Sequence, residues 1–124
     1  MQNLKDITLA TNVLALLVGE FIREQQQKVT AADVHTKSLN SLVSYVDVEA
    51  EKMLVAGLHE ILPEAGFLTE EETTLQEKGD TFWIIDPLDG TTNFLHGLPI
   101  FAISIALYHK GEVVVGVVYE IGHN

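Results

Sequence analysis

The sequence predicts an α+β domain in which two N-terminal helices pack on an antiparallel β-sheet. Apolar residues recur at helical spacing over the first half of the chain, and from Phe67 onward they alternate with a period of two. No internal repeat, low-complexity tract or Gly/Ser-rich linker interrupts the 124 residues. We therefore expect residues 1–124 to form one layered unit, with the helices on a face of the sheet.

The first helix is predicted over residues 4–26. Its apolar residues follow an i, i+3, i+4, i+7 spacing, and Asn3 is a suitable N-cap. The apolar run 13–18 within it is too short to span a bilayer and lacks the basic flank of a signal peptide. We expect a cytoplasmic protein without a membrane partner.

The second helix is predicted over Asp47–Leu62, after a polar stretch without a regular period. Asp47 can cap this helix, and Ala50 and Leu54 share one apolar face. Pro63 ends it, because proline cannot continue a helix.

Short apolar runs predict three strands, Thr81–Asp86, Phe101–Tyr108 and Val113–Tyr119. The last two flank residues 109–112, a hairpin loop that contains glycine. The valine-rich last strand is apolar enough to have a neighbour on either side. Because the sequence stops soon after this strand, we expect these 124 residues to be the N-terminal part of a longer fold.

Composition excludes several kinds of function. The chain has no cysteine, so disulfides, thiolate metal sites and a cysteine nucleophile are excluded. Its 47% hydrophobic content excludes a disordered acidic tail. The formal net charge of −11 would repel nucleic acid and anionic membranes, so we expect neither as a partner. This negative charge is compatible with cations as ligands.

Most of this negative charge lies in residues 60–89, which hold nine acidic residues and one lysine. A charge cluster is ordinarily a solvated face. Here, however, Asp86 and Asp89 directly follow an apolar strand, and Glu70 and Glu71 follow another apolar run. Carboxylates at the ends of apolar strands are expected to converge at an edge of the core.

The segment WIIDPLDGTTNF carries the candidate chemistry. A tight turn through Pro87 and Gly90 would point the carboxylates of Asp86 and Asp89 the same way. The amides of Gly90 and Thr91 would then offer donors to an anion, beside two carboxylates that suit a divalent cation. Metal-assisted phosphoryl transfer needs this combination.

Asp-Pro-x-Asp-Gly alone also fits an ordinary reverse turn. A calcium loop of the EF-hand type fits less well, because its further oxygen ligands and closing glutamate are absent.

The longer string resembles the signature of the inositol monophosphatase family, Trp-x-x-Asp-Pro-x-Asp-Gly-Thr-x-Asn-Phe, within the lithium-sensitive, Mg²⁺-dependent phosphatases. FLTEEE, HGLPIFAISIAL and GVVYE are similar to the same family and stand in its order. The resemblance covers nearly all of this chain but about the first half of the usual family domain. It implies a layered αβαβα sugar-phosphatase fold, two or three Mg²⁺ ions and a small phosphorylated polyol or sugar as substrate. We also expect a homodimer.

The resemblance assigns roles position by position. Five positions match metal ligands of the family: Glu70, Glu71, Asp86, the carbonyl of Leu88, and Asp89. Three positions match catalytic residues of the family: Thr91, Asp47 and Glu70. Thr91 would orient the attacking water, and Asp47 would lie behind Thr91. The phosphate-binding group is Gly90, Thr91 and Asp89.

Electrostatics agrees with these assignments. Two carboxylates about 4 Å apart repel by on the order of 4 kcal/mol at an effective dielectric near 20, so bound cations must offset the repulsion. Magnesium suits an all-oxygen site, whereas zinc prefers nitrogen or sulfur ligands. One metal would activate the water that attacks phosphorus, and the other would stabilise the leaving alkoxide.

The sequence departs from the family pattern in two ways. Thr69 stands where the family usually has glycine. The third motif of the family, Trp-Asp-x-Ala-Ala-Gly, has no counterpart in these 124 residues. We expect the whole protein to hydrolyse inositol monophosphate or a related sugar phosphate, and these 124 residues to be weakly active or inactive. Alternatives are a 3′-phosphonucleotide or fructose-bisphosphate phosphatase, or a noncatalytic cation-binding module that self-associates through the edge after Tyr119.

Overall fold

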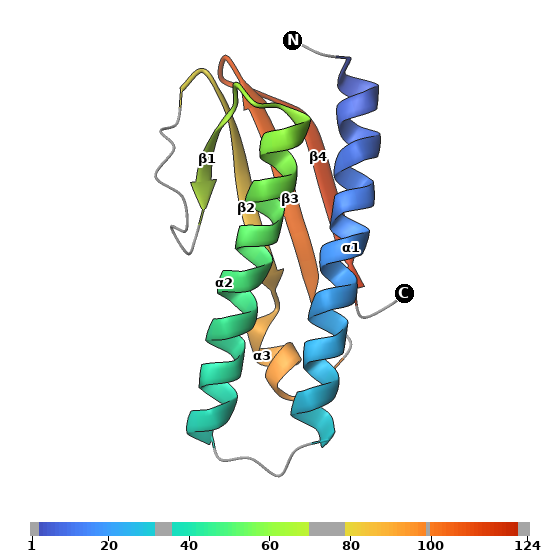
Figure 1. Ribbon diagram of the computed structural model, residues 1–124, viewed down its shortest axis with the longest axis vertical. Helices are drawn as coiled ribbons and strands as arrows, with labels where there is room; N and C mark the ends of the chain where they lie inside the picture. Colours follow the sequence, from blue (N-terminus) through green and yellow to red (C-terminus); the bar gives the residue numbers. More distant parts are fainter. Residues whose placement is uncertain (1–2, 32–35, 70–78, 99, 122–124) are drawn as a thin grey trace.

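The computed structural model describes residues 3–31, 36–69, 79–98 and 100–121. The elements in chain order are α1 (Leu4–Ala31), α2 (Thr36–Ile61), β1 (Gly66–Thr69), β2 (Thr81–Asp89), α3 (Thr91–Leu95), β3 (Ala102–His109) and β4 (Glu112–Glu120). Helices α1 and α2 lie side by side on one face of the sheet (Figure 1). The predicted α+β class is confirmed.

Helix α1 begins where the sequence predicted and runs five residues beyond the predicted end. The N–H of Lys5 donates to the side-chain oxygen of Asn3 at 2.8 Å, which confirms the N-cap. Ile7, Val18 and Ile22 face the core and are almost fully buried.

Helix α2 begins at Thr36, so the prediction that Asp47 caps it is wrong. Asp47 lies in the helix interior. The buried face extends back to Val46, four residues before Ala50, which continues the helical period ahead of the predicted start. The predicted end is confirmed, because the helix stops at Ile61, just before Pro63.

The sheet has the order β1-β2-β3-β4. Strands β2, β3 and β4 pair antiparallel as predicted, while β1 pairs parallel to β2, so the sheet is mixed. Lys110 and Gly111 both have positive φ and form a two-residue hairpin turn between β3 and β4. In the described part of the chain β4 is an edge strand, and the second neighbour expected for it is not among these residues.

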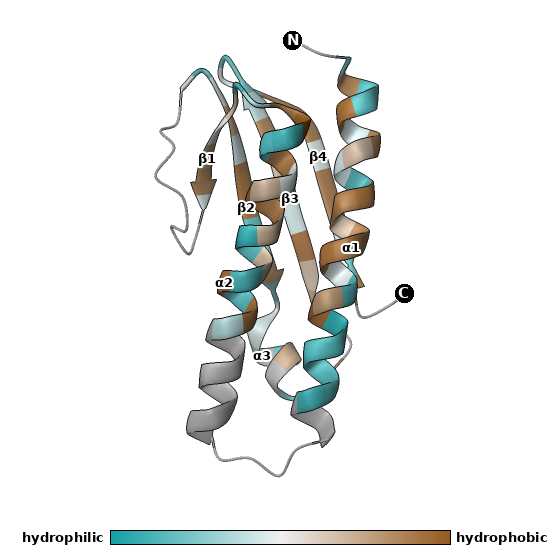
Figure 2. Cartoon of the chain, viewed as in Figure 1, coloured by the Kyte–Doolittle hydropathy of each residue, from teal (hydrophilic) through white to brown (hydrophobic). Residues whose placement is uncertain are grey.

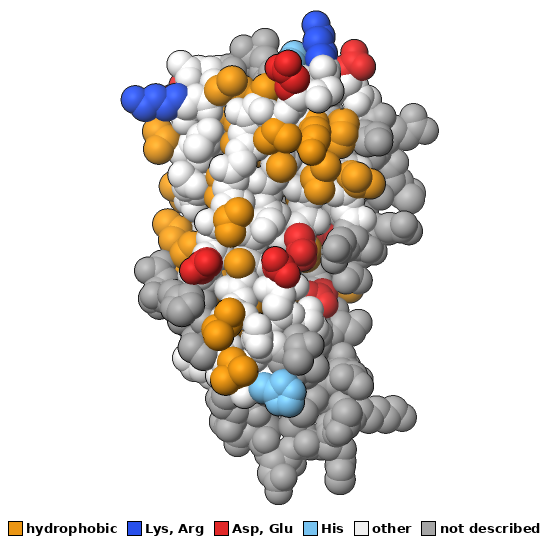
Figure 3. Space-filling view, turned by 180° about the vertical axis from the view of Figure 1, so that it is seen from behind, with side chains coloured by type: hydrophobic (Ala, Val, Ile, Leu, Met, Phe, Trp, Pro, Cys, Tyr) orange, Lys and Arg blue, Asp and Glu red, His pale blue; other side chains and the backbone are white. Residues whose placement is uncertain are grey.

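Alternate residues of β2, β3 and β4 face the helices and form the core. This buried set includes Trp83, Ile85, Ile103, Ile105, Leu107, Val115 and Val117. No described helix covers the opposite face of the sheet, where Phe82 and Tyr108 stack with ring centroids 5.3 Å apart. Apolar side chains gather on this far face with acidic side chains among them (Figure 3). None of the described helices has the length and apolar content to cross a membrane.

Candidate active site

The candidate site lies where β2 ends and α3 begins. Asp86 pairs with Ser104 and Asp89 pairs with Ala102, so three steps along β2 match two along β3. This β-bulge adds one residue to β2. Because direct cross-strand partners share a face and Ser104 and Ala102 are two residues apart, the bulge places Asp86 and Asp89 on the same face of the sheet. That face is the one away from α1 and α2.

A tight turn at Pro87 was predicted to align the two carboxylates, and this prediction is wrong in its mechanism. Strand β2 continues to Asp89, and Pro87 lies within the bulge, one of the few places in a sheet that tolerate proline. The extra residue shifts the side-chain alternation, which a regular strand would have kept.

Hydrogen bonds connect the bulge to α3. The N–H of Leu88 donates to Asp86 Oδ1 at 3.3 Å, and the hydroxyl of Thr91 donates to the Leu88 carbonyl at 3.3 Å. A carbonyl oxygen has a second lone pair, so the Leu88 carbonyl can still accept a further ligand. The Asp86 carboxylate, Leu88 carbonyl and Thr91 hydroxyl are therefore linked within six residues of chain.

The backbone conformation between β2 and α3 requires glycine at position 90. Its φ is +99°, and a Cβ at this position would lie 2.7 Å from the carbonyl oxygen of Ile100. The carbonyl of Gly90 accepts the N–H of Phe94 at 3.0 Å, which forms the first turn of α3. The amides of Gly90 and Thr91 thus lie at the start of a helical turn, where N–H groups lack intrahelical partners.

Packing fixes the loop after α3. Phe94 is fully buried and meets Phe101 edge to face at 5.7 Å between ring centroids. The side-chain amide of Asn93 donates to the Ile100 carbonyl at 2.8 Å. From α1, the side-chain amide of Gln26 donates to the Leu98 carbonyl at 3.1 Å.

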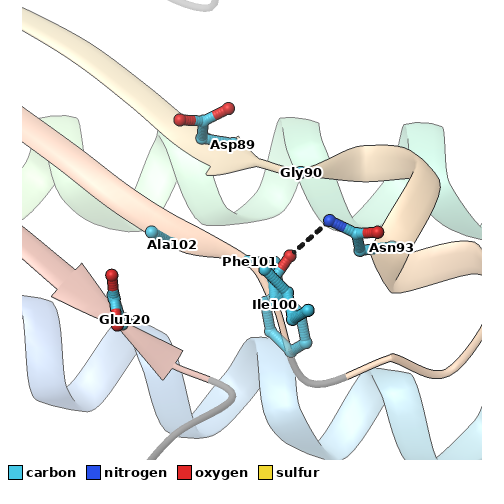
Figure 4. Close-up of a pocket in the computed structure, with 7 residues that line it drawn as sticks. All are labelled: Asp89, Gly90, Asn93, Ile100, Phe101, Ala102 and Glu120. Carbon is cyan, nitrogen blue, oxygen red and sulfur yellow. Dashed lines mark hydrogen bonds between the residues drawn. The ribbon is translucent and has the colours of Figure 1, made fainter.

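A cavity of about 240 Å³ lies beside Asp89 and Gly90. Its lining residues are Asp89, Gly90, Asn93, Ile100, Phe101, Ala102 and Glu120 (Figure 4). Ala102 pairs with Asp89 on one side and Glu120 on the other, so the two carboxylates share a face across a small side chain.

Glu120 was not foreseen from the sequence. The hairpin loop alone would place Tyr119 opposite Ala102, but a register shift between Leu107 and Tyr108 brings Glu120 there instead. A bulge of this kind leaves no clear signal in the apolar pattern.

Three further residues were predicted for this site, Glu70, Glu71 and Asp47. Glu70 and Glu71 fall outside the described residues. Asp47 is half-buried on α2, which packs against both β2 and α3, and its role behind Thr91 stays a prediction. One turn further, Glu51 is a fully buried carboxylate that the sequence reasoning did not single out.

Two carboxylates and a carbonyl are an all-oxygen donor set, which suits Mg²⁺ better than Zn²⁺ because zinc prefers nitrogen or sulfur ligands. Within the described ranges, which omit residues 70–78, no three acidic, histidine or cysteine side chains are grouped closely enough to hold a metal. Asp86, Leu88 and Asp89 could therefore supply only part of a metal site, which would need further ligands.

The sequence model of the inositol monophosphatase family matches residues 3–124. The chain belongs to this family. The family resemblance seen in the sequence is thereby confirmed.

Relatives within the inositol monophosphatase family carry different names. "Inositol-1-monophosphatase" of Mesorhizobium japonicum is 42% identical over 107 residues, which are 86% of this chain and 40% of the relative. "Nus factor SuhB" of Pasteurella multocida is 45% identical over 103 residues, 82% of this chain and 39% of the relative.

Solved structures of the family support the fold. Inositol monophosphatase from Anabaena superposes with a TM-score of 0.79 at 27% identity, over 99% of this chain and 43% of that protein. Extragenic suppressor protein SuhB from Bartonella henselae superposes with a TM-score of 0.77 at 34% identity, over 95% of this chain and 46% of that protein. The chain thus spans less than half the length of the relatives that it matches.

Proposed function

We propose that this chain is the N-terminal, metal-binding portion of a Mg²⁺-dependent phosphomonoesterase. The observation that carries the proposal is the β2 bulge, which puts Asp86 and Asp89 on one sheet face beside the Leu88 carbonyl and the Thr91 hydroxyl. A complete domain of this type would add a layer over the uncovered sheet face, where the groove between Ile84 and Val118 contains Asp86.

In this proposal, separate residues bind the metal, orient the water and bind the phosphate. Asp86, Asp89 and the Leu88 carbonyl hold Mg²⁺, together with Glu70 and Glu71. Bound Mg²⁺ supplies charge neutralisation and lowers the pKa of water. The Thr91 hydroxyl orients the attacking water, with Asp47 supporting it from α2. The amides of Gly90 and Thr91 bind phosphate.

The substrate we propose is inositol monophosphate or a related small sugar phosphate. The names of two relatives support this class: besides the Mesorhizobium protein, "Fructose-1,6-bisphosphatase/inositol-1-monophosphatase" of Thermotoga maritima is 47% identical over 78 residues. Fructose bisphosphate and 3′-phosphonucleotides are the alternatives. Lithium inhibition and a cytoplasmic homodimer belong to the same proposal.

The second candidate is a noncatalytic cation-binding module that acts through protein contacts. Two observations favour it: β4 lies at the edge of the sheet among the described residues, and some relatives are named as Nus factors. A net charge of −11 disfavours direct binding of nucleic acid, because the phosphate backbone would be repelled.

A chimera tests the first proposal against the second. Residues 1–124 replace the matching portion of the Mesorhizobium phosphatase, and phosphate release from inositol 1-phosphate is measured with and without Mg²⁺. We expect Mg²⁺-dependent turnover that Asp86→Asn abolishes and Asp80→Asn, at the opposite end of the sheet, leaves intact. A folded chimera without turnover, or turnover unaffected by Asp86→Asn, would refute the phosphatase proposal. The separate 124-residue chain is expected to show little or no turnover.

A further inference from the structure

Glu120 lies opposite the candidate metal ligand Asp89 across one strand of the sheet. Asp89 of β2 and Glu120 of β4 both pair with Ala102 of β3, so the three residues form a row across the far face of the sheet (Figure 4). Neighbouring strands are about 4.8 Å apart, so the backbones of Asp89 and Glu120 are separated by about 10 Å. The small side chain of Ala102 leaves the cavity between the two carboxylates open.

This cavity has an apolar floor and one apolar end. Strand β3 forms the floor and contains no Asp, Glu, Lys or Arg, and Figure 2 shows it in pale to brown tones over most of its length. At the end near α3, Ile100 lines the cavity and is 56% exposed. Apolar walls suit the C–H bonds of a small ring. The carboxylates suit its hydroxyl groups, because an ionised carboxylate only accepts hydrogen bonds.

The backbone next to Glu120 is held in place by two hydrogen bonds. The N–H of Ile121 donates to the Phe101 carbonyl at 3.0 Å, and the Arg23 guanidinium donates to the Ile121 carbonyl at 2.7 Å. Within the described ranges, no cation pairs with Glu120 and no hydrogen bond occupies its carboxylate. Both of its oxygens are therefore available to a ligand in the cavity.

The two sides of the cavity differ in the chemistry that they accept. The proposed function places the metal and the phosphate on the Asp89 side. On the Glu120 side, no cation of the described residues offsets the carboxylate, so this side attracts hydroxyl groups and repels a second phosphate. The cavity of about 240 Å³ is smaller than the roughly 300–1,000 Å³ of pockets for drug-sized ligands, so its size suits one small ring.

We propose that Glu120 is a specificity-determining residue, whose carboxylate accepts hydrogen bonds from the hydroxyl groups of a polyol monophosphate and repels substrates that carry a second phosphate at their far end. The inference rests on the proposed function, because that function places the phosphate beside Asp89. It favours inositol monophosphate and similar monophosphates over fructose 1,6-bisphosphate.

Substrate selectivity of the chimera with the Mesorhizobium phosphatase tests this role. We measure kcat/KM for inositol 1-phosphate, fructose 1,6-bisphosphate and p-nitrophenyl phosphate, whose ring has no hydroxyl groups. Glu120→Ala should lower the ratio of inositol 1-phosphate to p-nitrophenyl phosphate about tenfold, mainly through KM, because hydrogen bonds to a charged group are lost. Glu120→Gln keeps an acceptor oxygen and removes the charge, so it should raise kcat/KM for fructose 1,6-bisphosphate relative to inositol 1-phosphate several-fold.

Glu112→Gln is the matched control, because Glu112 is an exposed glutamate at the other end of β4, and it should change neither ratio. Equal losses for all three substrates in Glu120→Ala would overturn the proposal, because they would indicate a structural role. A raised Mg²⁺ requirement with unchanged ratios would also overturn it, because Glu120 would then act on the metal. An unsubstituted chimera without turnover would overturn the proposed function and this inference together, whereas an active chimera with unchanged ratios would overturn this inference alone.

Binding to the 124-residue chain tests the placement of the ligand without turnover. In ¹H–¹⁵N NMR spectra recorded with Mg²⁺, millimolar inositol 1-phosphate should shift the amide signals of Gly90, Ala102 and Glu120. Inorganic phosphate should shift the signal of Gly90 and not that of Glu120. Glu120→Ala should weaken the response to inositol 1-phosphate several-fold, and Glu112→Gln should not. Shifts confined to Gly90 with both ligands, or no shift at Ala102 and Glu120, would overturn the proposal.

Discussion

Replacing Gly90 by alanine should destabilise the protein through two separable effects. The first is the backbone, because φ at Gly90 is +99°, a region that residues with a Cβ avoid. The second is space, because the added Cβ would lie 2.7 Å from the Ile100 carbonyl oxygen and 3.1 Å from Phe101 Cα. Both neighbours are backbone atoms, so a side-chain rotation cannot relieve the contact.

The chain contains its own controls. Gly111 has φ +85° with no atom within 4 Å of an added Cβ, and Gly116 has neither a positive φ nor a near neighbour. A positive φ costs an L-residue about 1–2 kcal/mol. Overpacking against fixed atoms adds about 1–3 kcal/mol. We expect losses of roughly 3 kcal/mol for Gly90→Ala, about 1 kcal/mol for Gly111→Ala, and within about 0.5 kcal/mol of zero for Gly116→Ala.

Urea unfolding followed by circular dichroism measures the three free energies of unfolding, and the slope m shows whether the unfolded states are comparable. In thermal melts, 3 kcal/mol corresponds to a fall in Tm of roughly 10 °C for a chain of this size. Equal losses for Gly90→Ala and Gly111→Ala would refute the reasoning, because they would show that the β2–α3 junction moves away from Ile100 at no cost.

Two further changes test how the site is held. Phe94→Ala removes a fully buried ring next to Phe101 and should cost about 3–5 kcal/mol in urea unfolding; a loss below about 1 kcal/mol would contradict the packing described for α3. Arg23→Ala removes the guanidinium that donates to the Ile121 carbonyl at 2.7 Å, tying the end of β4 to α1, and should cost about 1–3 kcal/mol by the same measurement. Lys5→Ala, an exposed cation on the same helix, should change stability by less than about 0.5 kcal/mol, and an equal loss in both variants would remove the special role of Arg23.

The fold was predictable where one periodicity dominates. Apolar spacing located α1 and the three antiparallel strands to within a few residues, apart from the last part of β2 and the end of α1. The start of α2 was missed although Leu39, Leu42, Val43 and Val46 follow an i, i+3, i+4, i+7 spacing, because the polar residues between them were interpreted as a loop without a regular period. The parallel pairing of β1 was missed because four residues do not reveal the direction of their partner.

The site was predictable in its residue types and not in its geometry. Asp86 and Asp89 stood out because two carboxylates follow an apolar strand and precede a glycine. Their common direction comes from a bulge, and a second bulge brings Glu120 opposite Ala102. Each bulge depends on pairing between strands, which local sequence patterns do not encode.

Binding of Mn²⁺, as a paramagnetic substitute for Mg²⁺, tests the central claim most directly. In ¹H–¹⁵N NMR spectra of the ¹⁵N-labelled chain, the amide signals of residues 86–91 should be the first to disappear as Mn²⁺ is added. Asp86→Asn and Asp89→Asn should each restore those signals at the same Mn²⁺ concentration, and Asp80→Asn should not. Broadening centred elsewhere, or unchanged broadening in both Asp86→Asn and Asp89→Asn, would contradict the assignment of this strand end as a metal site.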